Sequence, residues 1–332
     1  MVIDRGSEAS EEKERAGRTK SDQAWIDRDL YPWTGKHLDV GGGVKMHYLD
    51  EGPRDGEVLV MLHGNPTWSF YWRHLIAGFS SQYRVIVPDH VGCGLSDKPG
   101  DDRYDYRLQR RVEDVEKLLE SLSIRSNVTL VLHDWGGMIG MAYATRNKDR
   151  VKRLVVLNTA GFGLPEGRKL PWQIALVRFL PFFSVPVRGF NAFSVGATWT
   201  CSTVKGRLTK AVKRMYLAPY DSWRNRIAVH RFVQDIPLKE GDPSFPLVKR
   251  VSDELPHWSK TPLLVLWGMK DFVFDEHFLA EWKRRLPHGE VHTFPDAGHY
   301  VTEDAHEKIV PLLRTFLDAN PLSASVARAA AS

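Results

Sequence analysis

Short, largely apolar runs alternate with stretches of helical periodicity along most of the chain. Runs of this length are typical of strands that are buried on both faces of a parallel sheet. The runs that we interpret as such strands are 58–62, 83–88, 128–132, 154–157, 262–267 and 290–294. Ahead of them, residues 36–40 and 44–49 flank three consecutive glycines, which is the pattern of a β-hairpin.

Helical periodicity fills several of the gaps between these runs. Apolar residues recur at helical spacing from Leu108 to Leu122, a helix of small residues is expected over 136–145, and a final helix is expected after Thr302. Strands and helices that alternate in this way predict an α/β fold with a mostly parallel central sheet and helices on both faces.

The alternation stops in one place. Residues 161–256 contain no clear parallel strand, are rich in Trp, Phe, Leu, Arg and Pro, and are typical of several short helices. They could form an extra helical layer, but we interpret them as a helical cap over the carboxyl ends of the strands, where ligands bind in open α/β sheets. The main domain would then comprise 24–160 and 257–320, between a disordered lead (1–23) and a flexible tail (321–332).

Composition and charge exclude several classes of protein. The chain has 332 residues, of which 42% are hydrophobic and 26% charged, as in an ordinary globular protein. The net charge of +5 is only mildly basic and the acidic residues are spread throughout, so we expect no nucleic acid partner. No apolar stretch is long enough for a spanning helix, the charged first residues do not resemble a secretory signal, and two cysteines suit a reducing compartment, so we expect a cytoplasmic protein.

The candidate chemistry centres on the sequence Leu132-His133-Asp134-Trp135-Gly136-Gly137, which follows a predicted strand. A tight turn between a strand and a helix holds one side chain exposed, as in the nucleophile elbow G-x-S-x-G, but here the central residue is Asp134. A carboxylate that attacks a saturated carbon forms an ester, which water can cleave, whereas a serine would form an ether that water and histidine cannot cleave. Asp134 therefore indicates substitution at an sp³ carbon through a covalent alkyl-enzyme, and the alternative is an aspartate that only caps a helix.

Two further residues follow the chain order of a catalytic triad. His299 lies between a late strand and the last helix, where a histidine can serve as the general base that activates water. Asp271 follows the strand 262–267 and could orient His299, with Asp275 as a rival acid. The earlier strand 154–157 is followed by Asn158 and Thr159, which cannot supply the acid.

Asn65 and Trp135 are candidate donors beside Asp134. The loop of Asn65 follows a predicted strand and could present a backbone N–H toward an oxyanion together with the backbone N–H of Trp135. Their side chains add an amide and an indole donor, which would suit a leaving halide, although a turn-forming Asn and a packed Trp are the simpler alternatives. No Cys and His cluster has the spacing of a zinc site and no glycine-rich dinucleotide fingerprint follows a strand, so no metal and no cofactor is implied.

Together these pieces resemble an α/β-hydrolase of the haloalkane dehalogenase family, over roughly residues 38–317. The matching segments are His63-Gly64-Asn65-Pro66-Thr67, Tyr71-Trp72-Arg73, Pro88-Asp89, Gly92-x-Gly94-x-Ser96, His133-Asp134-Trp135-Gly136-Gly137, Gly268-x-x-Asp271 and Gly298-His299. The resemblance implies that Asp134 is the nucleophile, His299 the base and Asp271 the acid, and that Asn65 and Trp135 bind halide. An acid after the later strand, together with Asn65, is similar to the third dehalogenase subfamily, which also contains β-lactone decarboxylases of bacterial olefin synthesis.

Four functions remain open at this point. The first is dehalogenation, in which halide leaves, an ester forms on Asp134 and water releases an alcohol. The second is decarboxylation of a cis-3-alkyl β-lactone to a long-chain cis-alkene with the same residues. An epoxide hydrolase would need cap tyrosines above Asp134, for which Tyr216 and Tyr220 are available, and a non-catalytic binding protein is the fourth.

In the three enzymatic cases the expected partner is a small apolar molecule. The cap offers a set of aromatic side chains for an alkyl tunnel, with ordinary packing as the alternative: Trp172, Phe179, Phe182, Phe183 and Phe193. The sequence indicates no particular oligomeric state.

Overall fold

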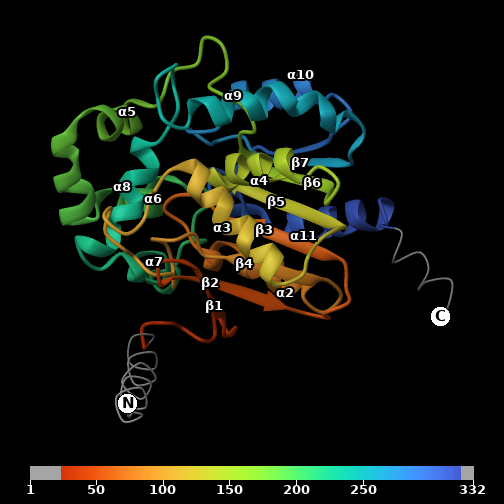
Figure 1. The fold of residues 1–332 in the computed structure, drawn as a ribbon, viewed down its shortest axis with the longest axis horizontal. Helices are drawn as coiled ribbons and strands as arrows, with labels where there is room; N and C mark the ends of the chain where they lie inside the picture. The colour runs from red at the N-terminus through yellow and green to blue at the C-terminus, as the bar shows by residue number, and fades with distance from the viewer. Residues whose placement is uncertain (1–23, 323–332) are drawn as a thin grey trace, which may run out of the picture.

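A computed structural model describes residues 24–322 of the chain. The expected lead (1–23) and residues 323–332 of the expected tail lie outside the described residues. Within the described part, one eight-stranded sheet runs through the molecule in the order β1-β2-β4-β3-β5-β6-β7-β8 (Figure 1). The strands are β1 (Lys36–Gly41), β2 (Val44–Glu51), β3 (Val58–Leu62), β4 (Arg84–Pro88), β5 (Val128–Asp134), β6 (Val151–Thr159), β7 (Leu263–Gly268) and β8 (Glu290–Phe294).

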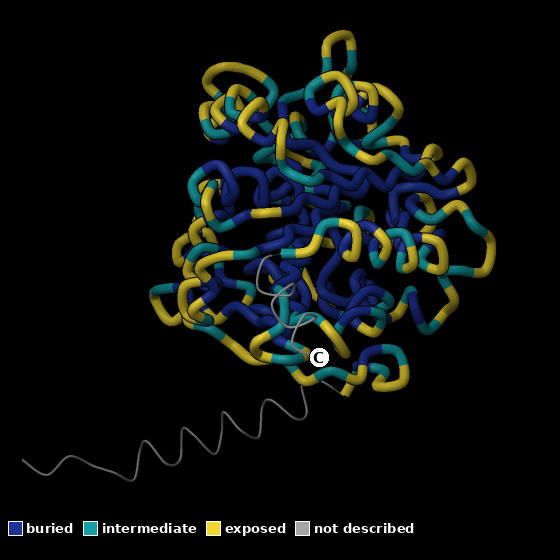
Figure 2. Tube along the Cα trace, turned by 90° about the vertical axis from the view of Figure 1, so that its right-hand side faces the viewer, coloured by how far each residue is buried: buried dark blue, intermediate teal, exposed yellow. Residues whose placement is uncertain are grey.

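The sheet is mostly parallel, as the sequence predicts. Only the hairpin strand β2 pairs antiparallel, with β1 on one side and β4 on the other, and all later pairs are parallel. Parallel strands are buried on both faces, which explains why their sequences are continuous apolar runs. The strands are mostly buried, and Figure 2 shows the buried interior of the molecule beneath an exposed outer layer.

Alternate residues of each strand feed two separate hydrophobic cores. On β3, for example, Val58, Val60 and Leu62 belong to one core and Leu59 and Met61 to the other. The first core is completed by α3 (Leu108–Ser121), α4 (Trp135–Arg146), α9 (Phe245–Glu254), η6 (Leu255–Lys260) and α10 (Glu276–Arg285). The second is completed by η1 (Ser69–Trp72), α2 (Arg73–Phe79) and α11 (Val301–Ala319). The sheet therefore carries helices on both faces.

A long helical segment connects β6 to β7, and we call residues 160–262 the insert. Besides α9 and η6 it contains α5 (Trp172–Phe179), η2 (Pro181–Phe183), η3 (Val185–Gly189), α6 (Ala192–Thr200), α7 (Lys210–Leu217), η4 (Ala218–Tyr220), η5 (Arg224–Arg226) and α8 (Ile227–Gln234). A small core of its own holds part of it together, with Ile174, Val177 and Val187 packed against Tyr220 and Val229. Helices α5 to α8 gather at one end of the sheet (Figure 1). Among the described residues, no helix has both the length and the hydropathy to cross a membrane.

Strands β5 and β6 extend further than their apolar runs. The sequence predicts that they end at residues 132 and 157, whereas pairing continues to Asp134 and Thr159. The added residues are His133 and Asp134 on β5 and Asn158 and Thr159 on β6, all of which are polar and buried. A hydrophobic pattern cannot detect such residues, although their backbone remains in the ladder.

The start of α4 is the tightest junction of the fold. A Cβ atom on Gly136 would lie 1.9 Å from the backbone oxygen of Leu62, and one on Gly137 would lie 1.7 Å from the Thr159 hydroxyl. Only glycine lets the helix approach both neighbouring strands so closely.

We therefore expect Gly136→Ala to lower the free energy of unfolding by about 1–3 kcal/mol, because backbone must move to admit the methyl group. Chemical denaturation measures this loss. Gly196→Ala on α6 is the matched control, since a Cβ atom there meets nothing within 4 Å. Equal stability of the two variants would contradict the close packing of α4 against β3.

Candidate active site

Asp134 occupies the sharp turn between β5 and α4. Its backbone has φ 51° and ψ −126°, in the left-handed region that a side chain other than glycine rarely adopts. Strained backbone of this kind clusters at functional sites, where surrounding packing maintains it. Asp134 lies at the cap position of α4, but its side chain makes no capping hydrogen bond. The carboxylate is thus free of the structural task that was the simplest alternative to catalysis.

Two backbone donors bind the Asp134 carboxylate. The backbone N–H of Asn65 donates to Oδ1 over 2.6 Å, and the backbone N–H of Trp135 also donates to the side chain. These are the two N–H groups that the sequence assigns to an oxyanion site, and here they bind the aspartate itself. A Cβ atom on Gly64 would lie 1.9 Å from Oδ1, so this approach also requires glycine.

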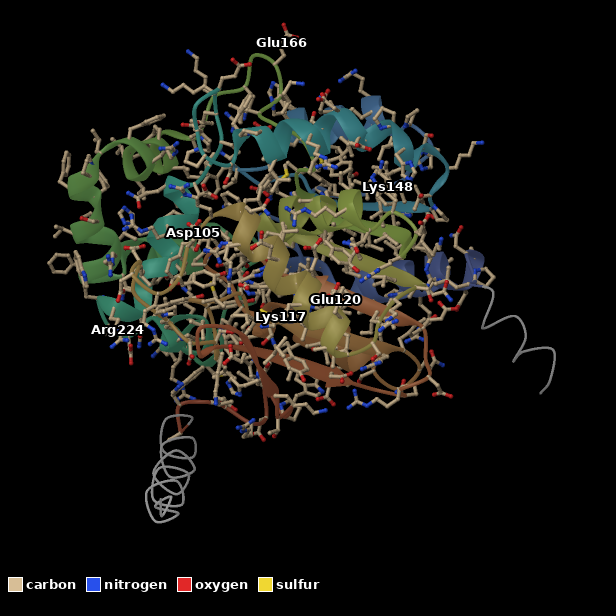
Figure 3. All side chains as sticks on the ribbon, viewed as in Figure 1. Asp105, Lys117, Glu120, Lys148, Glu166 and Arg224 are labelled. Atoms are coloured by element: carbon tan, nitrogen blue, oxygen red, sulfur yellow. The ribbon has the colours of Figure 1, made fainter. Side chains whose placement is uncertain are left out.

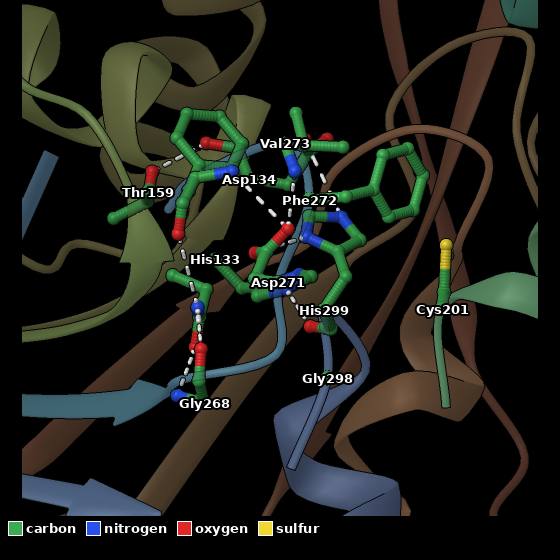
Figure 4. Close-up of polar contacts among 12 residues, drawn as sticks. His133, Asp134, Thr159, Cys201, Gly268, Asp271, Phe272, Val273, Gly298 and His299 are labelled. Carbon is green, nitrogen blue, oxygen red and sulfur yellow. Dashed lines mark hydrogen bonds and ion pairs between the residues drawn. The ribbon is translucent and has the colours of Figure 1, made fainter. Parts of the chain in front are cut away.

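His299 stands between two aspartates (Figure 4). Its Nδ1 lies 2.7 Å from Asp271 Oδ2, which is a hydrogen bond, and its Nε2 lies 3.7 Å from Asp134 Oδ2, which is an ion-pair distance. The structure therefore brings together the three residues that the sequence assigns to a triad, each of them almost fully buried.

Burial and charge act in opposite directions on the titration of this pair. Burial raises the pKa of Asp134, while the charge of His299 and the two backbone donors oppose that rise without cancelling it. Burial alone would lower the pKa of His299, but the Asp271 carboxylate beside it outweighs burial and raises the pKa above its ordinary value. Asp271 thus favours a protonated imidazole at the centre of the site.

Asp271 is held in place by the loop after β7. Its Oδ1 accepts hydrogen bonds from the backbone N–H groups of Val273 (2.7 Å) and Phe274 (3.1 Å), which leaves Oδ2 for His299. The rival acid, Asp275, instead caps α10 and forms an ion pair with Arg168 at 2.7 Å. The structure thus pairs Asp271, and not Asp275, with His299.

Two residues that sequence reasoning did not single out support this arrangement. His133 Nε2 lies 2.9 Å from the backbone oxygen of His299, and burial lowers the pKa of His133 well below its ordinary value, so the neutral ring donates this bond. The side chain of Asn158 accepts from the backbone N–H of Gly268 and donates to its oxygen, at 2.7 and 3.0 Å. It thereby fastens β6 to β7 just before the acid loop. The only signal in the sequence was their position, directly before Asp134 and at the end of a strand.

A cavity of about 440 Å³ opens above Asp134 and His299. Its lining is predominantly apolar and comes from both the strand ends and the insert, including Ile174, Val177 and Phe278. Among the aromatic residues expected in a tunnel, the lining includes two, Phe183 and Phe193. The other three, Trp172, Phe179 and Phe182, are exposed to solvent instead. Composition cannot tell which face of a short helix turns inward.

Asn65 and Trp135 both line the cavity beside Asp134. The Asn65 amide donates to the backbone oxygen of Val229 over 3.0 Å, while its own oxygen is buried without a partner. The Trp135 ring packs on Phe232, and its indole N–H has no hydrogen-bond partner among the described residues. The indole therefore remains a donor to whatever occupies the cavity, whereas the amide is partly engaged.

The tyrosines that an epoxide hydrolase would need point elsewhere. Tyr216 donates to the buried Glu303, which also pairs with Arg73, and Tyr220 donates to the backbone oxygen of Thr67 over 3.1 Å. Neither tyrosine lines the cavity. Within residues 24–322, no cluster of three or more His, Cys, Asp or Glu side chains is arranged to hold a metal ion.

Comparisons with known proteins show the family to which this fold belongs. The model of the alpha/beta hydrolase fold family matches residues 57–305. A cis-3-alkyl-4-alkyloxetan-2-one decarboxylase of Xanthomonas campestris is 52% identical over 297 residues, which cover 88% of this chain and 98% of the relative. A haloalkane dehalogenase of Mycolicibacterium paratuberculosis is 35% identical over 281 residues, covering 82% and 89%. Among solved structures, haloalkane dehalogenase DatA from Agrobacterium tumefaciens C58 superimposes with a TM-score of 0.75 at 25% identity, covering 90% of this chain and 99% of its own.

The expectation that Asp134 is the nucleophile, together with the opposing effects on its pKa, predicts a particular pH dependence for its alkylation. Only the ionised carboxylate attacks, so the rate falls as the pH falls through a raised pKa, above the value of about 3.9 for a free aspartate. In His299→Gln the charge that lowers this pKa is absent, so the acid limb moves to higher pH. Intact-mass measurement of ester formation from a 1-bromoalkane, in a single turnover across pH, tests this shift. Coincident acid limbs in the two proteins would contradict it.

Proposed function

Because this chain belongs to the alpha/beta hydrolase fold family, we propose that Asp134 is its nucleophile and that its substrate is a cis-3-alkyl-4-alkyl β-lactone. The products are a cis-alkene and carbon dioxide. The sequence alone puts halide displacement first and lactone decarboxylation second. The higher identity to a relative named for decarboxylation favours the second reading over the first.

One observation carries the proposal: a buried carboxylate faces a predominantly apolar cavity, with a histidine and a second aspartate behind it. The backbone N–H of Asn65 donates to Asp134 Oδ1, so we propose Oδ2 as the oxygen that attacks. The insert contributes much of the apolar lining, and we propose that it acts as the cap of the site. Such a cavity suits alkyl chains on both sides of a small polar ring.

In the first step, an oxygen of Asp134 attacks carbon 4 of the lactone ring. A bond forms between this oxygen and carbon 4, and the bond between carbon 4 and the ring oxygen breaks. The ring electrons leave as a carboxylate that stays attached to carbon 3. Carbon 4 is inverted, and the strain of the four-membered ring assists the step.

In the second step, the carboxylate on carbon 3 leaves as carbon dioxide. Its bonding electrons form the double bond between carbons 3 and 4, and the ester bond to Asp134 breaks, which restores the free carboxylate. Anti elimination after inversion converts a cis-lactone to a cis-alkene. The negative charge moves from the substrate carboxylate in the apolar part of the cavity to Asp134, where the backbone N–H of Asn65 stabilises it, so the apolar lining favours this step. The imidazolium of His299 stabilises the charge that returns to Asp134.

Dehalogenation is the second candidate, and the unpartnered indole N–H of Trp135 beside Asp134 favours it. That reaction shares the attack by Asp134 but leaves an ester with no internal group to expel, so His299 must activate water. Epoxide opening is less well supported, since it requires a proton donor for the alkoxide and both Tyr216 and Tyr220 donate elsewhere.

A side-by-side assay tests the choice of substrate. We expect wild-type protein to release cis-alkene from a long-chain cis-β-lactone faster than it releases bromide from 1-bromoalkanes, as scored by gas chromatography and bromide titration. Asp134→Ala should lower alkene formation by at least about a thousandfold, because the ester cannot form. Asp275→Asn is the matched control and should retain activity, since this acid lies outside the triad. Alkene formation by Asp134→Ala at the wild-type rate would remove Asp134 from the mechanism.

Turnover in water enriched in oxygen-18 tests the route of ester breakdown. Lactone decarboxylation should leave the Asp134 side chain unlabelled, because the bond between alkyl carbon and oxygen breaks and no water adds. Bromoalkane turnover should label it, because water attacks the carbonyl carbon of the ester. Mass spectrometry of the peptide that contains Asp134 measures both, with resting protein in the same water as control. Oxygen-18 found in the Asp134 side chain after lactone turnover would exclude the elimination step.

A further inference from the structure

Exposed apolar side chains gather on the insert. Eight of the ten large hydrophobic side chains that are exposed in the described part of the chain lie there. They are Trp172, Phe179, Phe182, Val185, Phe190, Val195, Trp199 and Trp223. Trp172 and Trp199 are 69% and 72% exposed, which is unusual for the most costly side chain to leave in water. Such concentration on one segment marks an interaction surface.

The same segment is strongly basic. Residues 167–220 contain nine Lys and Arg and no Asp or Glu. Acidic groups elsewhere in the described chain pair with four of the arginines: Arg168, Arg178, Arg207 and Arg214. No ion pair is found within residues 24–322 for Lys169, Lys205, Lys210 and Lys213. Lys213 lies with its Nζ 3.3 Å from the centre of the Trp199 ring, so cation and aromatic ring share one surface.

This surface lies beside the mouth of the cavity. Four residues of the insert are exposed and also line the cavity, so they mark where it opens: Lys169, Gln173, Ala192 and Thr200. Trp172 adjoins Gln173 in sequence and Trp199 adjoins Thr200. The helices α5 and α6 therefore present apolar side chains to the cavity on one side and aromatic side chains to solvent on the other.

We propose that this face of the insert, from α5 to α7, docks on a lipid bilayer that carries anionic headgroups. Aromatic side chains insert at the boundary between headgroups and acyl chains, and lysines bind the anionic surface, which together give reversible interfacial binding. A second copy of the chain fits this face less well. A two-fold contact would bring two unpaired basic surfaces against each other, and they would repel. Docking would place the cavity mouth against the bilayer, where water-insoluble dialkyl lactones partition; this last point rests on the proposed function.

Sedimentation with vesicles tests the docking without any substrate. We expect the full chain to bind vesicles of phosphatidylcholine with phosphatidylglycerol, to bind pure phosphatidylcholine far less, and to be released by salt. Trp172→Ser combined with Trp199→Ser, and separately Lys205→Glu combined with Lys210→Glu, should each weaken binding by about tenfold or more. Because these side chains are exposed, the substitutions should leave the unfolding temperature unchanged. A lower unfolding temperature would therefore reveal a folding defect.

The matched control places the same charge change elsewhere. Lys117→Glu combined with Lys283→Glu alters exposed lysines of α3 and α10, and neither helix belongs to the insert. Lys117 is labelled in Figure 3. This double variant should bind vesicles as the wild type does. If the control variant loses as much vesicle binding as the insert variants, then net charge alone explains the loss and the proposal is overturned. Absence of vesicle binding would also overturn it, as would a self-association in ultracentrifugation that the tryptophan variants abolish. Because none of these measurements uses turnover, their failure leaves the proposed reaction standing.

Discussion

The proposed chemistry depends on keeping the Asp134 carboxylate ionised inside a predominantly apolar cavity. Desolvation opposes the charge of Asp134, and the two backbone N–H groups and the imidazole of His299 offset part of that penalty. An anion with few water neighbours is also a stronger nucleophile than a hydrated one. Desolvation of the Asp134 carboxylate must be balanced by groups that stabilise its charge. The strained turn, the glycines beside it and the acid behind His299 together hold those groups in place.

The same balance explains why two reactions share one set of residues. A haloalkane loses its leaving group as a separate ion, so water must cleave the ester that remains. A β-lactone keeps its leaving group attached to the neighbouring carbon, and that group supplies the electrons that free the aspartate. The difference therefore lies in the substrate more than in Asp134, His299 and Asp271. This is why motif residues alone could not choose between the two reactions, and why overall similarity to relatives was needed.

The sequence predicts the sheet well because buried parallel strands are apolar throughout, as in β3. It also predicts that Asp134, His299 and Asp271 meet, because the carboxyl ends of parallel strands share one edge. It missed His133 and Asn158 as supports, since a hydrogen bond to a distant backbone oxygen leaves no periodic trace.

The cap aromatics show a different limit of sequence reasoning. Phe182 and Phe183 are neighbours of identical type, yet only Phe183 lines the cavity. The direction of each side chain depends on how short helices pack on one another, which composition does not contain. The exposed aromatic residues therefore had to be found in the structure, although the sequence had already marked the segment as unusual.

Glu303 has a mechanical consequence for the insert. This buried carboxylate binds Arg73 on α2 and Tyr216 on α7, and so ties the middle of the insert to the main body of the molecule. Helix α5, in contrast, packs chiefly on α8 and η2, which belong to the insert themselves. Because α5 packs chiefly on other helices of the insert, moving it would widen the cavity without displacing Asp134 or His299.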